Sequence, residues 1–182
     1  IGNAKDATLS RRLVSEFARV KRLDAKSIRG KRNVYEGLLT VEGKALMRGF
    51  EFNSKANLGM IMLCPFVLDL EEGLITVDHF VPKRMLVAPT SATHVAFSSG
   101  VMRVDFWLGE TEMIYSKVEN LPLDMTPVSF VLQPSLVPKG EGFNFYFLLI
   151  EFFQEVNGVQ YPLNSETFNV LTLLDVVDAD PV

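Results

Sequence analysis

The feature that most constrains the fold is a long apolar segment followed by a tight turn signal. Residues 143–153 are apolar at most positions, and Asn157-Gly158 follows shortly after them. A type I′ turn needs positive φ at both central positions, and Asn followed by Gly tolerates this best, so the pair predicts a β-hairpin. The first arm of the hairpin is apolar on both faces in its middle. This predicts a central strand rather than an edge strand.

Other segments after residue 40 alternate apolar and polar side chains with a period of two, which is typical of strands with one buried face. Turn signals such as Glu72-Gly73 and Ser99-Gly100 separate them. Proline cannot donate to a central ladder, so we expect Pro82, Pro89, Pro122, Pro127, Pro134 and Pro162 in loops or at strand ends. The expected strands span residues 50–52, 74–78, 102–106, 113–118, 128–132, 143–156 and 168–177.

Many short strands without intervening helices favour a mainly β fold over an α/β fold. At 182 residues the chain can bury a core without a metal or a disulfide. The expected architecture is an antiparallel β-sandwich, jelly-roll or Greek-key-like, with one N-terminal amphipathic α-helix. We expect two parts: a basic N-terminal helix and loop over residues 1–35, and a single antiparallel β domain over residues 36–182.

The helix is predicted between Ala7 and about Ala25, where apolar residues recur three or four positions apart. Thr8 or Ser10 could cap its start. The stretch 27–33, with Gly30 among bases that suit a helix C-terminus, is expected to end it.

Charge is divided unevenly along the chain. Residues 1–55 hold 13 of the 18 Lys and Arg against 6 acidic residues, a net of +7, whereas residues 56–182 carry a net of -11. Such asymmetry indicates a basic element that contacts an acidic partner, although a solvated helix face explains it equally well. The candidate interaction residues of this basic patch are Arg11, Arg12, Arg19, Arg22, Arg29, Lys31 and Arg32.

Residues suited to catalysis are few. His79 and His94 are the only candidates for a base near neutral pH. Asp78 and His79 are neighbours on an expected strand and should point to opposite faces, and a loop-capping role is the preferred interpretation of His94. No G-x-S-x-G string occurs, and Cys64 has apolar neighbours and is interpreted as an inert buried thiol. We therefore predict no catalytic residues and no enzyme.

Motifs for metals, cofactors and nucleotides are also missing. The two histidines and one cysteine lack any short ligand spacing, so no metal site and no cofactor is predicted. Exposed carboxylates such as Glu71, Glu72, Glu110 and Glu112 are interpreted as a solvated rim. Tyr35 is the only aromatic residue near the basic cluster at residues 29–32. Trp107, at strand period, is expected in the core or in an interface.

Several strings spread over nearly the whole chain carry a resemblance: residues 29–34 (RGKRNV), 49–53 (GFEFN), 80–82 (FVP), 92–94 (ATH), 150–158 (IEFFQEVNG) and 161–163 (YPL). With these strings in this order, the chain resembles a family of uncharacterised bacterial proteins of unknown function. Members carry a further basic, glycine-containing segment upstream and no obvious secretion signal, which implies that Ile1 is an internal start. The resemblance implies no activity, cofactor or site residue.

The leading functional prediction is a non-enzymatic structural or interaction module. Its basic N-terminal element would dock on the acidic β domain of another copy, in a head-to-tail contact that builds a ring or a filament, or on another protein. The alternative is nucleic-acid attachment through the same segment. An enzyme, and a sheet face that binds a carbohydrate or another ligand, remain open. The longest apolar run, about residues 145–150, is too short for a transmembrane segment. The compartment is undecided, with the cytoplasm or a larger assembly slightly favoured.

Overall fold

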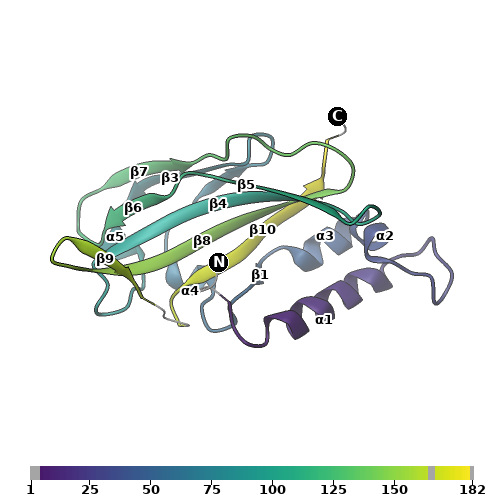
Figure 1. The fold of residues 1–182 in the computed structure, drawn as a ribbon, viewed down its shortest axis with the longest axis horizontal. Helices are drawn as coiled ribbons and strands as arrows, with labels where there is room; N and C mark the ends of the chain where they lie inside the picture. The colour runs from purple at the N-terminus through teal and green to yellow at the C-terminus, as the bar shows by residue number, and fades with distance from the viewer. Residues whose placement is uncertain (1–4, 164–166, 181–182) are drawn as a thin grey trace.

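The structure, a computed structural model, describes residues 5–163 and 167–180. It is mainly β with antiparallel sheets and an N-terminal helix, as predicted (Figure 1). The strands are β1 Phe50–Glu51, β2 Val67–Asp69, β3 Leu74–Phe80, β4 His94–Asp105, β5 Glu110–Tyr115, β6 Glu119–Pro122, β7 Val128–Leu132, β8 Phe143–Val156, β9 Val159–Pro162 and β10 Val170–Asp178. The helices are α1 Leu9–Arg22, α2 Val34–Leu38, α3 Val41–Met47, α4 Leu58–Ile61 and α5 Pro82–Met85. None of the helices in the described ranges is both long enough and apolar enough to span a membrane.

The larger sheet is built around β8. Its strand order is β1-β10-β8-β4-β5, with β6 added to β4 and β9 added to β8. Strand β8 pairs with β4 on one side and β10 on the other, so the prediction of a central strand is confirmed. The predicted hairpin is confirmed as well, since Val156 pairs with Val159 across Asn157 (φ 53°) and Gly158 (φ 77°).

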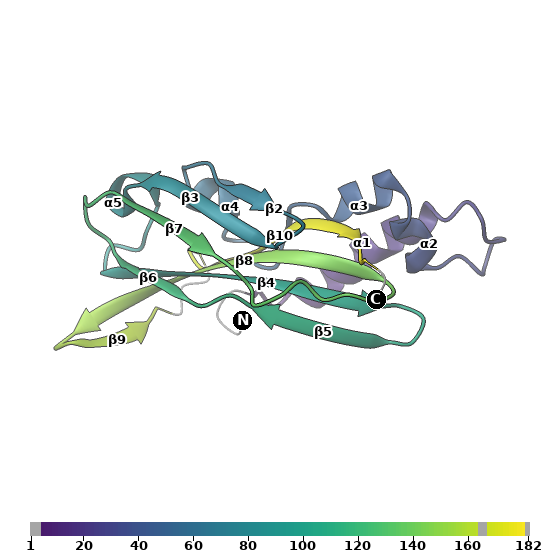
Figure 2. The same ribbon diagram turned by 90° about the horizontal axis from the view of Figure 1, so that it is seen from above.

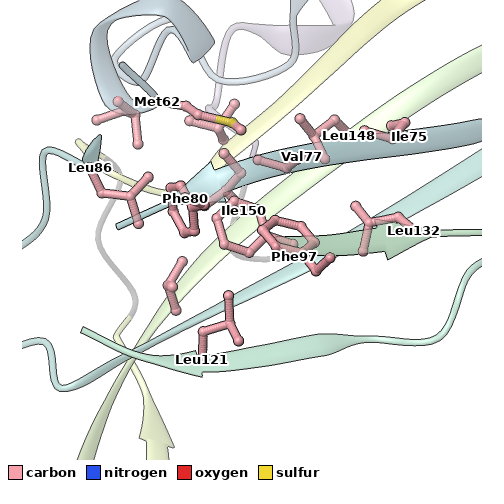
Figure 3. Packing of buried hydrophobic residues seen from close by; sticks show 14 of the residues in the cluster. Met62, Ile75, Val77, Phe80, Leu86, Phe97, Leu121, Leu132, Leu148 and Ile150 are labelled. Atoms are coloured by element: carbon pink, nitrogen blue, oxygen red, sulfur yellow. The ribbon is translucent and has the colours of Figure 1, made fainter. Parts of the chain in front are cut away.

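A second sheet, in the order β2-β3-β7, packs over one face of the larger sheet (Figure 2). Phe80 and Phe130 of this small sheet contact Phe97 of β4, with ring centroids 5.5 and 4.9 Å apart. Ile150 of β8 packs in the same buried cluster (Figure 3). The two sheets therefore form the sandwich-like layer that the alternating segments predict.

The opposite face of the larger sheet is covered by helices. Side chains alternate along β8, so Leu148 and Ile150 enter the cluster under the small sheet while Phe145 and Phe147 enter a second cluster on the other face. α1, α2 and α3 contribute to that second cluster, and α1 packs against α2 and α3. This alternation explains why the middle of β8 is apolar on both faces.

α1 matches the predicted helix but is shorter at its C-terminal end. Thr8 is the N-cap without a side-chain bond. Asp6 fixes the residue before the helix, since its Oδ1 accepts from the Thr8 amide over 2.6 Å. The helix ends at Arg22, so residues 27–33 form a separate loop in which Gly30 (φ 94°) turns the chain, and the prediction that this stretch ends the helix is wrong.

Four short helices follow that the periodicity did not predict. Three of them begin at polar caps: Asn33, Thr40 and Asn57 accept hydrogen bonds from Glu36, Gly43 and Gly59, respectively. Asn and Thr are favoured at this position because the side-chain oxygen satisfies an amide that the helix leaves unpaired. These caps, together with Pro82 at the first position of α5, are the local signals for such short helices.

Candidate interaction surface

The seven predicted basic residues lie on two adjoining segments. Arg11, Arg12, Arg19 and Arg22 belong to α1, and Arg29, Lys31 and Arg32 belong to the loop between α1 and α2. This loop projects at one end of the elongated molecule, and the β8–β9 hairpin lies at the other end (Figures 1 and 2). We call residues 24–33 the basic loop.

Two of the seven basic residues are already engaged within the molecule. Arg12 Nη2 lies 2.6 Å from Asp6 Oδ2, and the guanidinium also donates to the backbone oxygens of Glu51 (2.6 Å) and Phe52 (3.0 Å). Arg19 Nη1 pairs with Glu16 Oε2 over 2.8 Å. Arg12 therefore ties α1 to the segment at β1, and its donors are largely used.

The other five, Arg11, Arg22, Arg29, Lys31 and Arg32, are exposed. None of them forms an ion pair with an acidic residue in the part of the chain that the structure describes. Arg32 Nη1 donates to the Arg22 carbonyl over 3.3 Å, which connects the basic loop to the end of α1. The structure thus leaves uncompensated positive charge on α1 and the basic loop.

A buried carboxylate, Asp24, organises the basic loop. Its Oδ1 accepts from the amides of Lys26 (3.0 Å) and Ser27 (2.9 Å), and its Oδ2 accepts from the Asn33 amide (3.0 Å). Burial raises the pKa of Asp24, but the hydrogen bonds from these groups outweigh it and hold the pKa at about 2. Asp24 therefore fixes both ends of the segment that presents Arg29 and Lys31.

We expect Asp24→Asn to loosen the basic loop, because a neutral amide is a weaker acceptor for three backbone N–H groups. Since the pKa of Asp24 in the folded protein is about 2 against an ordinary 3.8, the carboxylate stabilises the loop above pH 3.8. This contribution is lost as the pH falls from 3.8 toward 2. Amide hydrogen exchange at neutral pH should speed up at Ser27 and Asn33 in the variant.

The matched control is Asp124→Asn, because the hydrogen bond recorded for the Asp124 carboxylate in the described chain is an exposed one from the Thr126 amide. It should leave exchange at Ser27 and Asn33 unchanged. Unchanged exchange in Asp24→Asn as well would contradict the anchoring role of Asp24.

The exposed aromatic residue Trp107 contacts the helix that follows the basic loop. Tyr35, in α2 directly after the loop, contacts Trp107 of the turn between β4 and β5, with ring centroids 5.4 Å apart. Trp107 is 66% exposed and Leu108 is 72% exposed. Of the two expected positions for Trp107, core or interface, its exposure excludes the core. Tyr35 and Trp107 are far apart in sequence, so only the fold reveals this pair.

Negative charge gathers around a cavity of about 430 Å³ between the turn before β3, residues 136–139 and the end of β10. Glu71, Asp178 and Asp180 line it together with Lys139, and Asp178 also pairs with Lys44 over 2.6 Å. We call this the acidic cavity. The sequence did not indicate that these residues lie together, because the lining comes from four separate segments.

Two buried polar side chains shape the acidic cavity. Tyr146 donates its hydroxyl to the Leu70 carbonyl over 2.6 Å, and burial together with Asp180, Asp175 and Asp69 raises its pKa to about 12. Asn144 donates its Nδ2 to the Pro138 carbonyl over 3.0 Å, whereas its buried Oδ1 has no hydrogen-bond partner among the described residues. The carboxylates of Glu71, Asp178 and Asp180 on the cavity wall suit a ligand that brings N–H donors.

The two histidines lie apart from both surfaces. The predicted alternation of Asp78 and His79 is wrong, because a β-bulge in β3 (His79 φ 52°) leaves both of them exposed. His94 begins β4; its Nδ1 lies 3.0 Å from Thr93 Oγ1 and its Nε2 lies 3.7 Å from Glu155 Oε2. Cys64 is half-buried, and burial raises its pKa.

Within residues 5–163 and 167–180, no group of three or more His, Cys, Asp and Glu side chains is arranged to hold a metal ion. No family model, curated protein or solved structure matches the chain.

Proposed function

We propose that the protein is a non-enzymatic interaction module in which the basic loop of one copy docks on the acidic cavity of another. The observation that carries the proposal is uncompensated charge of both signs on two separate surfaces of one molecule. Arg29 and Lys31 form no ion pair with an acidic residue in the described chain. Glu71 and Asp180 likewise form no ion pair with a basic residue there. A second copy supplies both partners at once.

The chemistry of the two surfaces is complementary. A guanidinium carries five N–H donors and no acceptor, and the acidic cavity offers the carboxylates of Glu71, Asp178 and Asp180. Hydrogen bonds between charged groups are stronger than neutral ones, so an inserted Arg29 or Arg32 would pair with Glu71 or Asp180. Asp24 holds the donor segment in a fixed shape, which lowers the entropy lost on docking.

The second candidate is nucleic-acid attachment through the same loop. Trp107 favours it, since an exposed aromatic next to basic side chains can stack on a base. This reading leaves the acidic cavity without a role, and the net charge of -4 opposes broad contact with phosphates. We therefore place self-assembly first.

The test is light scattering after size-exclusion chromatography, at low and at high salt, with a pair of charge-reversed variants. Arg29→Glu with Lys31→Glu should be monomeric, and Glu71→Lys with Asp180→Lys should be monomeric too. Mixing the two variants should restore a complex that holds one copy of each, because each retains one functional surface. The wild type should dissociate as salt screens the exposed charges.

Lys83→Glu with Arg84→Glu is the matched control, because it changes the charge equally on α5, away from the basic loop. It should assemble like the wild type. A wild-type monomer at low salt and high concentration would overturn the proposal. Nucleic acid that copurifies with the wild type and is lost in Arg29→Glu with Lys31→Glu would establish the second candidate instead.

A further inference from the structure

An apolar cavity of about 680 Å³ lies between α1 and the helix-covered face of the larger sheet. Leu9, Leu13 and Phe17 line it from α1, and side chains of β4, β5, β8 and β10 line the sheet side, among them Met102 and Met113. Cavities that bind small molecules in proteins have volumes of about 300–1,000 Å³ and mainly apolar walls. The size and lining of this cavity are those of a ligand site.

The cavity is held open at both ends of α1. Near its start, Arg12 bonds Asp6 and the backbone oxygens of Glu51 and Phe52. Farther along, Phe17 contacts Phe106, with ring centroids 6.2 Å apart. The side of α1 that faces the strands does not pack fully against them. The side chains of Leu9, Leu13, Met102 and Met113 are therefore half-buried and line the cavity.

A molecule that fills this space would bury apolar surface that the chain itself leaves open, which is the main source of favourable free energy in apolar sites. Three of the lining residues, Met47, Met102 and Met113, are methionines. Their unbranched side chains adapt to occupants of different shape. The walls therefore suit a flexible aliphatic chain.

The polar groups of the lining are few and indicate the charge of the ligand. Lys5 is the only charged residue among the lining residues, and it forms no ion pair with an acidic residue in the described segments. Thr111 and Tyr115 add hydroxyl groups on β5. One ammonium beside an apolar cavity complements an amphiphile with one aliphatic chain and one anionic head.

We infer that the cavity under α1 binds a single-chain anionic amphiphile of the fatty-acid class, with its aliphatic chain between α1 and the sheet and its carboxylate at Lys5. This inference does not depend on the self-assembly proposed above. Neither the basic loop nor the acidic cavity contributes a residue to it.

The test is calorimetric titration of the full chain with octanoate, decanoate and laurate below their micelle concentrations. Affinity should rise roughly tenfold with each added pair of methylenes, because each buried CH₂ contributes a similar free energy. Lys5→Glu should lower the affinity for laurate by about fivefold, which corresponds to the upper range for an exposed ion pair. It should leave the affinity for lauryl alcohol unchanged.

Met113→Trp should weaken laurate binding, because the larger indole narrows the cavity beside β5. Val131→Trp is the matched control, since Val131 is exposed on β7 of the small sheet, and it should bind laurate like the wild type. Circular dichroism of both variants checks that the fold is retained.

The inference is overturned if laurate does not bind, if binding persists unchanged in Met113→Trp, or if Lys5→Glu weakens laurate and lauryl alcohol equally. It is also overturned if Met113→Trp turns a wild-type dimer into a monomer while laurate has no effect. In that case a second copy covers the cavity.

Discussion

Replacing Phe97 with alanine is expected to lower the free energy of unfolding by about 3–5 kcal/mol, the range measured for truncating a buried Phe. Phe97 lies on β4 of the larger sheet and is fully buried. Its ring contacts Phe80 and Phe130 of the small sheet. Truncation would leave a void between the two sheets, where the surrounding strands are hydrogen-bonded and cannot collapse freely.

Urea denaturation followed by circular dichroism measures the loss. Phe97→Leu retains most of the apolar volume and should cost less than about 1.5 kcal/mol. Tyr161→Ala, on exposed β9, should change the free energy of unfolding by no more than about 0.5 kcal/mol. A loss below 1 kcal/mol in Phe97→Ala would mean that the two sheets do not share this core.

Local sequence patterns were sufficient for β7, β8 and the turn after β8, but not for β4, because the expected turn at Ser99-Gly100 lies inside that strand. The expected bounds 128–132 and 143–156 coincide with β7 and β8. Asn157-Gly158 specified its turn because the required backbone angles exclude most other residue pairs. Where one element is long and its pattern unambiguous, periodicity and turn chemistry agree with the tertiary structure.

Strand order and the division into two sheets could not be predicted in this way. β10 lies beside both β1 and β8, and these pairings join segments that are far apart in sequence. The expected strand 113–118 lies at 110–115, because β5 follows the turn at Gly109 and pairs Glu110 with Asp105. Such registers depend on partners that no local window contains.

The basic surface was predictable from charge, but the availability of its residues was not. Arg12 and Arg29 look alike in the sequence, yet Arg12 bonds the backbone near β1 while Arg29 is free of ion pairs within the described chain. Asn144 is a similar case, because its unpaired Oδ1 follows from tertiary burial next to residues 136–139. The positions of the charges follow from the sequence, but which of them remain unpaired depends on the tertiary structure.

Gly37→Ala is expected to destabilise the packing of α1 on α2 by about 1–3 kcal/mol, the range for overpacking a close contact. A Cβ at Gly37 would lie 2.2 Å from the Val20 carbonyl oxygen and 2.8 Å from its carbon. Both are backbone atoms, so a side-chain rotation cannot relieve the overlap and α1 must shift. Alanine has the better helix propensity by about 1 kcal/mol, but that gain is smaller than the cost of moving a helix.

Gly59→Ala provides the control, since a Cβ there meets only Asn57 Oδ1 at an ordinary 3.5 Å. Its free energy of unfolding should be unchanged or higher by up to about 1 kcal/mol. Because α1 carries Leu9, Leu13 and Phe17 over the apolar cavity, Gly37→Ala should also weaken laurate binding, whereas Gly59→Ala should not. If Gly37→Ala were as stable as the wild type, the close approach of Val20 to Gly37 would not hold α1 in place. Another contact would then have to hold α1 at its distance from the sheet.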